Sequence, residues 1–256
     1  MIRTDFALAD SFSDGLALVG VGTGDPGWER WGYIDPSGKV VVEPQYFQAQ
    51  RFSEGLAAVS VRQDCFGYID KTGKMVIEPH FSRATPFSGG LAAVWGGSET
   101  GYIDKTGKLV VEWESESGSF LQPFSGGCAM VVKTYYSDGD PMSTPWGYID
   151  TSGSLVTGLE FGEARPFSDG RAAVATGDGW GYIDKTGEMI IQPRFDLAGA
   201  FSGGLAVVAL DSEDKLAYID KTGAIVFEWQ YPWMNTEFMA TVFGEDPTGG
   251  YWLDEW

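Results

Sequence analysis

The sequence predicts an all-β fold built from tandem repeats, with about six to seven three-stranded antiparallel units. One phrase occurs five times as Gly-Tyr-Ile-Asp and once as Ala-Tyr-Ile-Asp, and each copy follows a Phe-Ser-x-Gly phrase. The tyrosines are Tyr33, Tyr68, Tyr102, Tyr148, Tyr182 and Tyr218, and the phenylalanines are Phe12, Phe52, Phe87, Phe124, Phe167 and Phe201. The tyrosines follow one another at 34 to 36 residues, and at 46 where one connection is longer. Such a period indicates that each repeat covers an apolar face of its neighbour.

Each repeat is expected to contain three short strands separated by glycine and proline. In the second repeat these strands cover residues 52–59, 66–70 and 74–79. The turn between the second and third strands reads Asp-x-Thr/Ser-Gly in every repeat, as from Asp70 to Gly73. The aspartate can accept a hydrogen bond from the backbone N–H two residues later, and the glycine can adopt a positive φ. We therefore predict a type I turn with a bulge at this position.

The rest of the pattern predicts how the strands pack. Third strands such as residues 40–42 and 189–191 are apolar at consecutive positions, so we expect them to be central in a sheet or covered on both faces. In the second strands an aromatic residue and the tyrosine point to one side, and the intervening glycine leaves room for a close neighbour. After the third strand an aromatic residue, an alanine and the next phenylalanine recur at three-residue intervals, as Tyr46, Ala49 and Phe52 do. We expect these residues to staple consecutive repeats together, with the phenylalanine buried.

The combined pattern, aromatic-Gly-Tyr-Ile-Asp-x-Thr-Gly-x-Val-Ile-x-Pro-x-Phe-x-x-Ala-x-Pro-Phe-Ser-x-Gly-Leu-Ala-x-Val, resembles the bacterial WG-repeat family. The resemblance extends from about Phe6 to Trp229. The chain departs from the pattern at the aromatic position (Thr100, Leu216), the glycine position (Ala217) and the proline position (Trp113, Leu159, Trp229). The resemblance implies a β-rich repeat of binding or scaffold type, with no shared activity or cofactor.

Charge and composition narrow the classes of partner. The chain has 256 residues and a formal charge of -19, from 17 basic and 36 acidic residues. Binding to a phosphate backbone requires clustered Lys and Arg, so we expect no nucleic-acid binding and favour a protein partner that is basic or neutral. No run of about 18 apolar residues and no secretory signal is present, which favours a cytoplasmic protein without membrane contact.

The period also predicts the domain organisation. No linker-like segment interrupts it, so we expect a single repeat domain over residues 1–256, with a degenerate terminal repeat at about 230–256. The chain begins inside a repeat junction, because Phe6, Ala9 and Phe12 match the end of a repeat. Residues 1–6 could supply a missing strand and close a propeller-like ring, or both ends could cap an open array. We favour the open, curved array.

The residues that could carry catalytic chemistry are better explained by structure. Asp-Lys-Thr-Gly also occurs in the phosphorylated loop of ion-pumping ATPases, but its four copies here all fall in the predicted turns. His80 is the only histidine, which leaves no His-His zinc pair, and carboxylates such as Glu43 and Glu78 recur at one repeat position. Cys65 and Cys128 show no metal or disulfide spacing and are expected to be reduced core residues. We predict no catalytic residue, cofactor or metal.

The connections between first and second strands are the candidate binding edge. They are long at residues 20–30 and 133–145 and short elsewhere, and insertions of this kind fall on one edge of a repeat array. Four aromatic residues in or beside these connections, Trp28, Trp95, Tyr135 and Tyr136, are the candidate anchors. The alternative is that they fold back onto their own repeats.

The favoured function is a non-enzymatic protein-interaction or scaffold module, such as an accessory or regulatory subunit. The alternative is a carbohydrate-binding or cell-surface module that uses the exposed aromatic residues of the loops.

Overall fold

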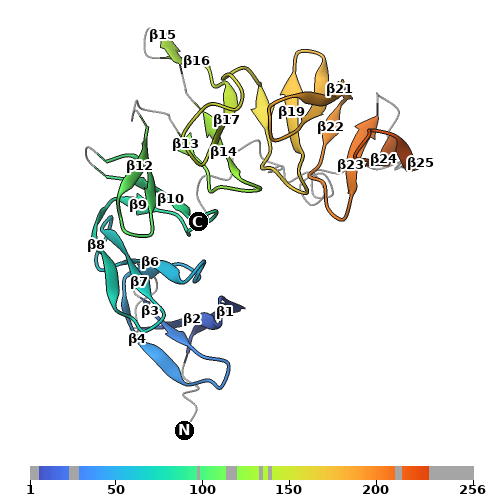
Figure 1. Cartoon of the computed structure of the whole chain (residues 1–256). Helices are drawn as coiled ribbons and strands as arrows, with labels where there is room; N and C mark the ends of the chain where they lie inside the picture. The colour runs from blue at the N-terminus through green and yellow to red at the C-terminus, as the bar shows by residue number, and fades with distance from the viewer. Residues whose placement is uncertain are drawn as a thin grey trace. The chain divides into compact units, whose positions relative to one another are not determined.

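The computed structural model describes residues 6–22, 29–96, 99–113, 120–132, 135–137, 140–210 and 215–230. These residues form β-strands and connections, without a helix among them, which confirms the all-β prediction (Figure 1). The chain divides into an N-terminal unit, Met1–Ser115, and a C-terminal unit, Glu116–Trp256. The predicted degenerate repeat at 230–256 lies outside the described residues except for Gln230.

The N-terminal unit contains three four-stranded antiparallel sheets. Sheet 1 consists of β1 (Leu8–Ser13), β2 (Leu16–Val21), β3 (Arg30–Ile34) and β4 (Val40–Tyr46). Sheet 2 consists of β5 (Gln48–Ala49), β6 (Leu56–Ser60), β7 (Phe66–Asp70) and β8 (Met75–Phe81). Sheet 3 consists of β9 (Arg83–Ala84), β10 (Leu91–Trp95), β11 (Gly101–Asp104) and β12 (Leu109–Glu112).

The C-terminal unit contains three further sheets and an inserted hairpin. Sheet 4 consists of β13 (Phe120–Leu121), β14 (Cys128–Val132) and β17 (Trp146–Asp150). Sheet 5 consists of β18 (Glu163–Ala164), β19 (Ala172–Thr176), β20 (Gly179–Ile183) and β21 (Met189–Phe195). Sheet 6 consists of β22 (Leu197–Ala198), β23 (Leu205–Leu210), β24 (Lys215–Asp220) and β25 (Ile225–Gln230). The inserted hairpin is β15 (Tyr135–Ser137) with β16 (Asp140–Ser143).

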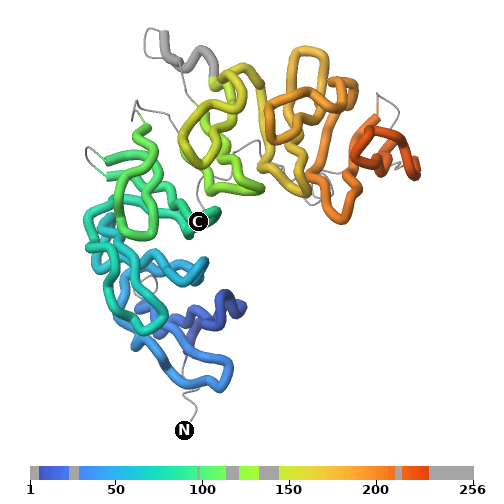
Figure 2. Tube along the Cα trace, in the orientation of Figure 1, coloured from blue at the N-terminus to red at the C-terminus, as the bar shows by residue number. Residues whose placement is uncertain are grey.

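In the complete sheets the strands follow one another in chain order, and Figure 2 traces this back-and-forth path. Four of them have one strand more than the predicted three because two residues of the junction pair with the next strand, as Gln48 does with Ser60 and Ala49 with Val59. None of these sheets closes on itself, and each unit taken alone is an open row of sheets. The prediction of tandem antiparallel repeats is therefore confirmed, with four strands as the full complement.

The expectation for the third strands was wrong. The third predicted strand is the outer strand of its sheet, as β8 is in the order β5-β6-β7-β8. Its residues alternate in exposure, with Val76 43% exposed and Ile77 5% exposed. Met75 packs on the core between sheets 1 and 2 and Ile77 lies in the core between sheets 2 and 3, whereas Val76 between them is exposed. Consecutive apolar residues therefore do not signal a strand that is central in its sheet or covered along its whole length.

The turns between second and third strands have the predicted geometry. Gly73 has φ +84°, and its counterparts Gly107 and Gly187 have φ +86° and +85°. The Thr72 backbone N–H donates to Asp70 Oδ1 at 2.8 Å, and the Thr72 hydroxyl donates to the same oxygen at 2.6 Å. The same contacts recur at the other five turns.

In sheets 1, 2, 3 and 5 the glycine of the second strand lies against the backbone of the third strand. In sheet 2, Phe66 pairs with Phe81 and Tyr68 pairs with Ile77, so β8 bulges opposite Gly67. A Cβ on Gly67 would lie 2.4 Å from the Ile77 carbonyl oxygen. The close neighbour expected beside this glycine is therefore the bulged strand of the same sheet.

Consecutive sheets within a unit share one kind of joint. We call the face of a sheet that carries the second-strand tyrosine its forward face, and the face that carries the Phe-Ser-x-Gly phenylalanine its backward face. At the joint between sheets 2 and 3, Tyr68 packs against Phe87 with 4.9 Å between ring centroids. The Tyr68 hydroxyl donates to the Thr85 carbonyl at 2.8 Å, and the Ser53 hydroxyl donates to the Phe87 carbonyl at 2.6 Å. Phe87 is fully buried, as the staple prediction requires.

The joint recurs with the same spacing along the chain. The other ring pairs, at 4.7 to 5.0 Å, are Tyr33–Phe52, Tyr148–Phe167 and Tyr182–Phe201. Their tyrosine hydroxyls donate to the carbonyls of Gln50, Arg165 and Gly199 at 2.6 to 2.9 Å. The ring pairs and their hydrogen bonds join neighbouring sheets, and most of the core lies between sheets.

Three of these joints carry an additional acidic clamp. Asp14 of sheet 1 has φ +53°, a conformation that aims its side chain at sheet 2. There the Gly55 N–H and the Lys71 ammonium each donate to its carboxylate at 2.6 Å. Glu54 with Lys105, and Asp169 with Lys221, make the equivalent ion pairs at 3.1 and 2.9 Å.

Candidate binding site

The inserted hairpin lies on the edge that the sequence singles out. It stands between β14 and β17 and pairs Tyr135 with Ser143 and Ser137 with Asp140. The predicted loop at 133–145 is thus in part a small antiparallel sheet of its own. Residues 23–28 of the other long connection lie outside the described residues.

The insertion leaves the pairing of sheet 4 unchanged. Its strands β14 and β17 pair from Cys128↔Asp150 to Val132↔Trp146. This is the register of sheet 2, where β6 and β7 pair from Leu56↔Asp70 to Ser60↔Phe66. Sheet 4 therefore has its regular pairing without the hairpin. The hairpin is inserted between the paired ends of β14 and β17.

A two-stranded hairpin leaves one edge of each strand without a ladder partner. In the described part of the chain, β15 and β16 pair with each other alone. Backbone N–H and C=O groups along such edges can pair with an extended segment of another chain. Pro141 in β16 has no N–H, so β15 is the strand with the fuller set of donors.

The four aromatic residues predicted as anchors do not lie together in the described structure. Trp28 lies outside the described residues. Tyr135 and Tyr136 are adjacent in β15 of the C-terminal unit, and only their backbone is described. Trp95 ends β10 in the N-terminal unit and is half-buried, so the structure does not bring it together with the tyrosines within one sheet.

Trp95 is engaged by its own sheet. The Arg83 guanidinium lies 5.9 Å from the centroid of its ring. Its carbonyl accepts hydrogen bonds from the Ser82 backbone N–H at 2.6 Å and from the Ser82 hydroxyl at 2.9 Å. These contacts hold Trp95 against its own repeat.

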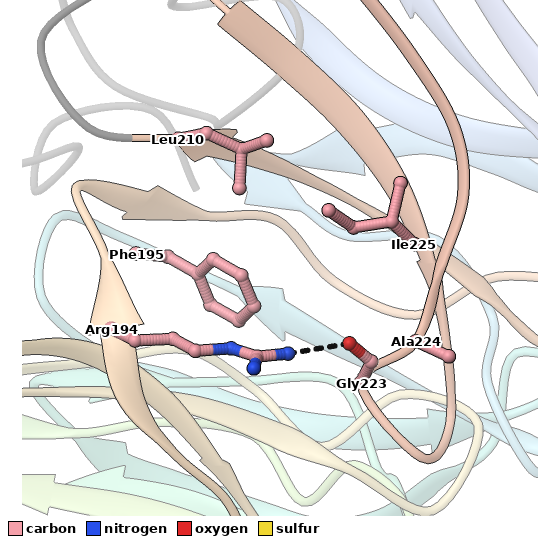
Figure 3. A pocket seen from close by; sticks show the side chains of 6 residues that line it. All are labelled: Arg194, Phe195, Leu210, Gly223, Ala224 and Ile225. Atoms are coloured by element: carbon pink, nitrogen blue, oxygen red, sulfur yellow. Dashed lines mark hydrogen bonds between the residues drawn. The ribbon is translucent and has the colours of Figure 1, made fainter.

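A pocket that sequence reasoning did not identify lies at the joint of sheets 5 and 6 (Figure 3). Its volume is about 380 Å³, and Arg194, Phe195, Leu210, Gly223, Ala224 and Ile225 line it. The Arg194 guanidinium donates to the Gly223 carbonyl at 2.5 Å and lies 5.0 Å from the Phe195 ring centroid. The only charged group of this pocket therefore holds a turn in place, and the lining supplies no nucleophile or general base.

The turn aspartates, His80 and the two cysteines are hydrogen-bonded within the fold, paired at the surface or buried. The hydroxyl two residues after each turn aspartate, together with backbone N–H groups, holds the pKa of that carboxyl below its usual value, as Thr72 does for Asp70. The His80 ring lies 3.2 Å from Glu99 and is half exposed. Cys65 and Cys128 are buried free thiols, as predicted, and burial raises the pKa of Cys128.

The described residues contain neither a candidate metal cluster nor a membrane-spanning helix. Among them, no group of three or more His, Cys, Asp or Glu side chains could hold a metal ion. The described part of the chain also holds no helix long and apolar enough to cross a bilayer.

The sequence repeats of the chain do not coincide with its sheets. The profile of the family described as "WG containing repeat" matches residues 31–63, 66–94, 101–135, 146–179 and 180–212. The chain belongs to the WG-repeat family. Its first matched repeat covers β3, β4, β5 and β6, so one sequence repeat ends one sheet and begins the next. This offset makes each WG repeat that lies within one unit span a joint.

Solved structures align with this chain at low sequence identity. A structure titled "Crystal structure of the eukaryotic initiation factor" aligns with a TM-score of 0.57 and 12% identity, over 86% of this chain and 64% of that one. Selenomethionine-substituted virginiamycin B lyase from Staphylococcus aureus aligns with a TM-score of 0.43 and 15% identity, over 89% and 85% of the two chains. BamB from Moraxella catarrhalis aligns with a TM-score of 0.45 and 14% identity, over 86% and 72%. A search of curated proteins found no similar sequence.

Proposed function

We propose that this WG-repeat protein is a non-enzymatic interaction module, and that its inserted hairpin binds an extended segment of a protein partner by strand addition. The observation that carries the proposal is the pairing of β15 with β16 alone, on a sheet whose own register does not need them. Strand addition would use the backbone for affinity and Tyr135 and Tyr136 for side-chain contacts.

The charge of the chain supports a basic partner segment. A formal charge of -19 attracts a basic peptide over roughly 8–10 Å at ordinary ionic strength, which mainly increases the association rate. The carbohydrate alternative is not advanced, because the aromatic anchor whose side chain is described, Trp95, lies against Arg83.

Selection of displayed peptides on two proteins tests the proposal. The first is the full chain, and the second has residues 133–145 replaced by a two-residue turn like Gly177-Asp178 between β19 and β20. Peptides with alternating side chains and basic residues should bind the full chain and lose at least about tenfold in affinity for the replacement.

The control is a chain with the Gly177-Asp178 turn changed to Ala-Ala, which should bind like the full chain. Thermal unfolding must show that the hairpin replacement is folded. A folded replacement that binds the selected peptides at full affinity would place the binding site away from the hairpin.

A further inference from the structure

Two sheet faces differ from the joints described within each unit: the forward face of sheet 6 and the backward face of sheet 1, which we call the end faces. At the internal joints, the second-strand tyrosine of the forward face is fully buried, as Tyr182 is against Phe201. The third-strand residue beside it is buried as well, as Ile191 is at 3% exposure. These residues are buried because the backward face of the next sheet covers them.

Sheet 6 leaves the same positions open. Tyr218, the counterpart of Tyr182, is 39% exposed, and Phe227, the counterpart of Ile191, is 60% exposed. Leu205 in the first strand of this face is 36% exposed, whereas its counterpart Leu56 in sheet 2 is 7% exposed. Three large apolar side chains on one sheet face therefore lack the cover that their counterparts have.

Sheet 1 shows the opposite half of the same joint. Phe12 is 53% exposed, whereas Phe52, Phe87, Phe167 and Phe201 are at most 1% exposed. Ile34 on the same backward face is half-buried, although its counterpart Ile69 in sheet 2 is fully buried. Sheet 1 thus presents the phenylalanine that a preceding tyrosine would contact.

The two open faces are complementary in their hydrogen-bonding groups. Across a joint, the tyrosine hydroxyl donates to the carbonyl of the residue after the junction alanine, which in sheet 1 is Asp10. The serine hydroxyl donates to the carbonyl of the next phenylalanine, as Ser168 does to Phe201 at 2.7 Å. Tyr218 and Ser202 occupy the donor positions on sheet 6, and Asp10 and Phe12 occupy the acceptor positions on sheet 1.

The two faces also carry no charged residue at the positions of the acidic clamp. In the clamped joints an acidic residue of one sheet pairs with the turn lysine of the next, as Asp169 does with Lys221. Sheet 6 has Gly203 at the acidic position, and sheet 1 has Pro36 at the lysine position. A joint between these faces would bury no unpaired carboxylate or ammonium, which would be costly.

We propose that the forward face of sheet 6 in one molecule docks on the backward face of sheet 1 in a second copy of the chain. The contact is heterologous, because a different surface is used on each molecule. Such contacts produce rings when the rotation between copies closes, and filaments when it does not. The exposed apolar residues at the two ends are the natural site for it, since large exposed apolar patches mark interaction surfaces.

Sedimentation of the full chain and its variants over a range of concentrations tests the proposal. The wild-type chain should show a mass that rises with concentration. Phe12→Asp, on sheet 1, and Tyr218→Asp with Phe227→Asp, on sheet 6, should each raise the dissociation constant more than about tenfold and give monomers. Mixing the two blocked proteins should restore a one-to-one dimer, because each retains the end that the other lacks.

Val76→Asp is the matched control, since Val76 is 43% exposed on the outer strand of sheet 2 and lies at neither end. It should associate like the wild type. Added salt should strengthen association, because two chains of charge -19 repel each other and the joint itself holds no ion pair.

Three results would overturn the proposal. One is a wild-type chain that stays monomeric at every concentration, as it would if residues 231–256 of the same molecule covered sheet 6. Another is a mixture of the two blocked proteins that remains monomeric, because it would show that the two intact faces do not bind each other. The third is a Val76→Asp chain that loses association as fully as the end variants do.

Discussion

Sheets 2 and 4 carry the same joint but differ at their outer edge. Both bury their tyrosine, Tyr68 or Tyr148, against the phenylalanine of the next sheet with about 5 Å between ring centroids (4.9 and 5.0 Å). Sheet 2 is completed by β8, whereas sheet 4 has only two isolated bridges there, Ile149↔Leu155 and Trp146↔Phe161. Leu155 is consequently 59% exposed.

The difference separates what the fold needs from what it tolerates. The joint and the aspartate turn are intact in sheet 4, since Ser152 donates to Asp150 as Thr72 does to Asp70. The outer strand and the first connection have both diverged, and the connection holds the inserted hairpin. In sheet 4 the outer edge therefore departs from the repeat while the joint is kept.

The largest expected effect comes from removing a staple. Phe87→Ala and Phe167→Ala should each lower the free energy of unfolding by about 3–5 kcal/mol, because each leaves a cavity at a joint. Equal losses would show that irregular sheet 4 depends on its joint as fully as sheet 2 does.

Chemical denaturation measures these losses, and Phe12→Ala is the control with an exposed ring. The control should cost less than about 1 kcal/mol, since exposed positions contribute little. A loss below about 1 kcal/mol for Phe167→Ala would contradict the equivalence of the two joints.

The second expected effect uses the glycine of the second strand to probe the outer edge. A Cβ on Gly67 would lie 2.4 Å from the Ile77 carbonyl oxygen in β8, and one on Gly147 would lie 2.5 Å from the Gly158 carbonyl oxygen. Gly67→Ala should cost about 1–3 kcal/mol, because β8 is held in a ladder and cannot yield freely. Gly147→Ala should cost less, because the opposing segment of sheet 4 belongs to no strand.

Thermal unfolding compares the two, with Gly177→Ala as the control. A Cβ on Gly177 has no other atom within 4 Å, so this variant should unfold close to the wild type. A larger loss for Gly147→Ala than for Gly67→Ala would show that the outer segment of sheet 4 is the more rigid one.

The third expected effect isolates the hydroxyl of the joint. Tyr68→Phe and Tyr148→Phe each remove the tyrosine donor to a partly buried carbonyl, at Thr85 and Arg165, and should cost about 1–3 kcal/mol. Denaturant titration measures this loss. Tyr218→Phe, in a ring that is 39% exposed, should change the stability of the monomer little. Equal losses at all three positions would show that the hydroxyl acts through its own sheet.

The sequence predicted those features that depend on neighbouring residues. The turn from Asp70 to Gly73 is set by contacts within four residues, so the sequence of the turn was enough to predict its geometry. The fourth strand was missed because Gln48 and Ala49 carry no periodicity of their own, and their strand exists through pairing with β6. The outer position of β8 was missed because consecutive apolar residues do not show which strand of a sheet is outermost.

The candidate surfaces were predictable to different degrees. The length of the 133–145 connection revealed an insertion, although not that it forms a hairpin. The end faces could not be read from letters, because Phe12 and Phe52 stand in the same phrase. Their exposures of 53% and 1% differ because sheet 1 covers Phe52, whereas no sheet among the described residues covers Phe12.

The smallest expected effect concerns the acidic clamp, which sheet 2 receives from sheet 1 and which sheet 4 cannot receive, having Thr151 in place of the lysine. Lys71→Thr copies that difference into sheet 2. Lys71 and Asp14 are partly exposed, with side-chain exposures of 44% and 31%, so the pair should contribute only about 0.2–1 kcal/mol. Lys185→Thr is the control, since this lysine has the same turn position in sheet 5 but faces Gly126 instead of a carboxylate.

The pH dependence identifies the clamp. The hydrogen bond from Lys71 is the main reason that the pKa of Asp14 lies below its ordinary value of 3.8. A carboxyl with a lowered pKa in the folded state stabilises the fold above its ordinary pKa, and this contribution disappears as the pH falls through the folded-state value. The stability difference between wild type and Lys71→Thr should therefore be constant from pH 7 to about pH 5, shrink below pH 3.8 and weaken in high salt. Denaturation at several pH values measures it, and a difference that persists unchanged at pH 2 would assign the effect of Lys71 to packing of its aliphatic stem.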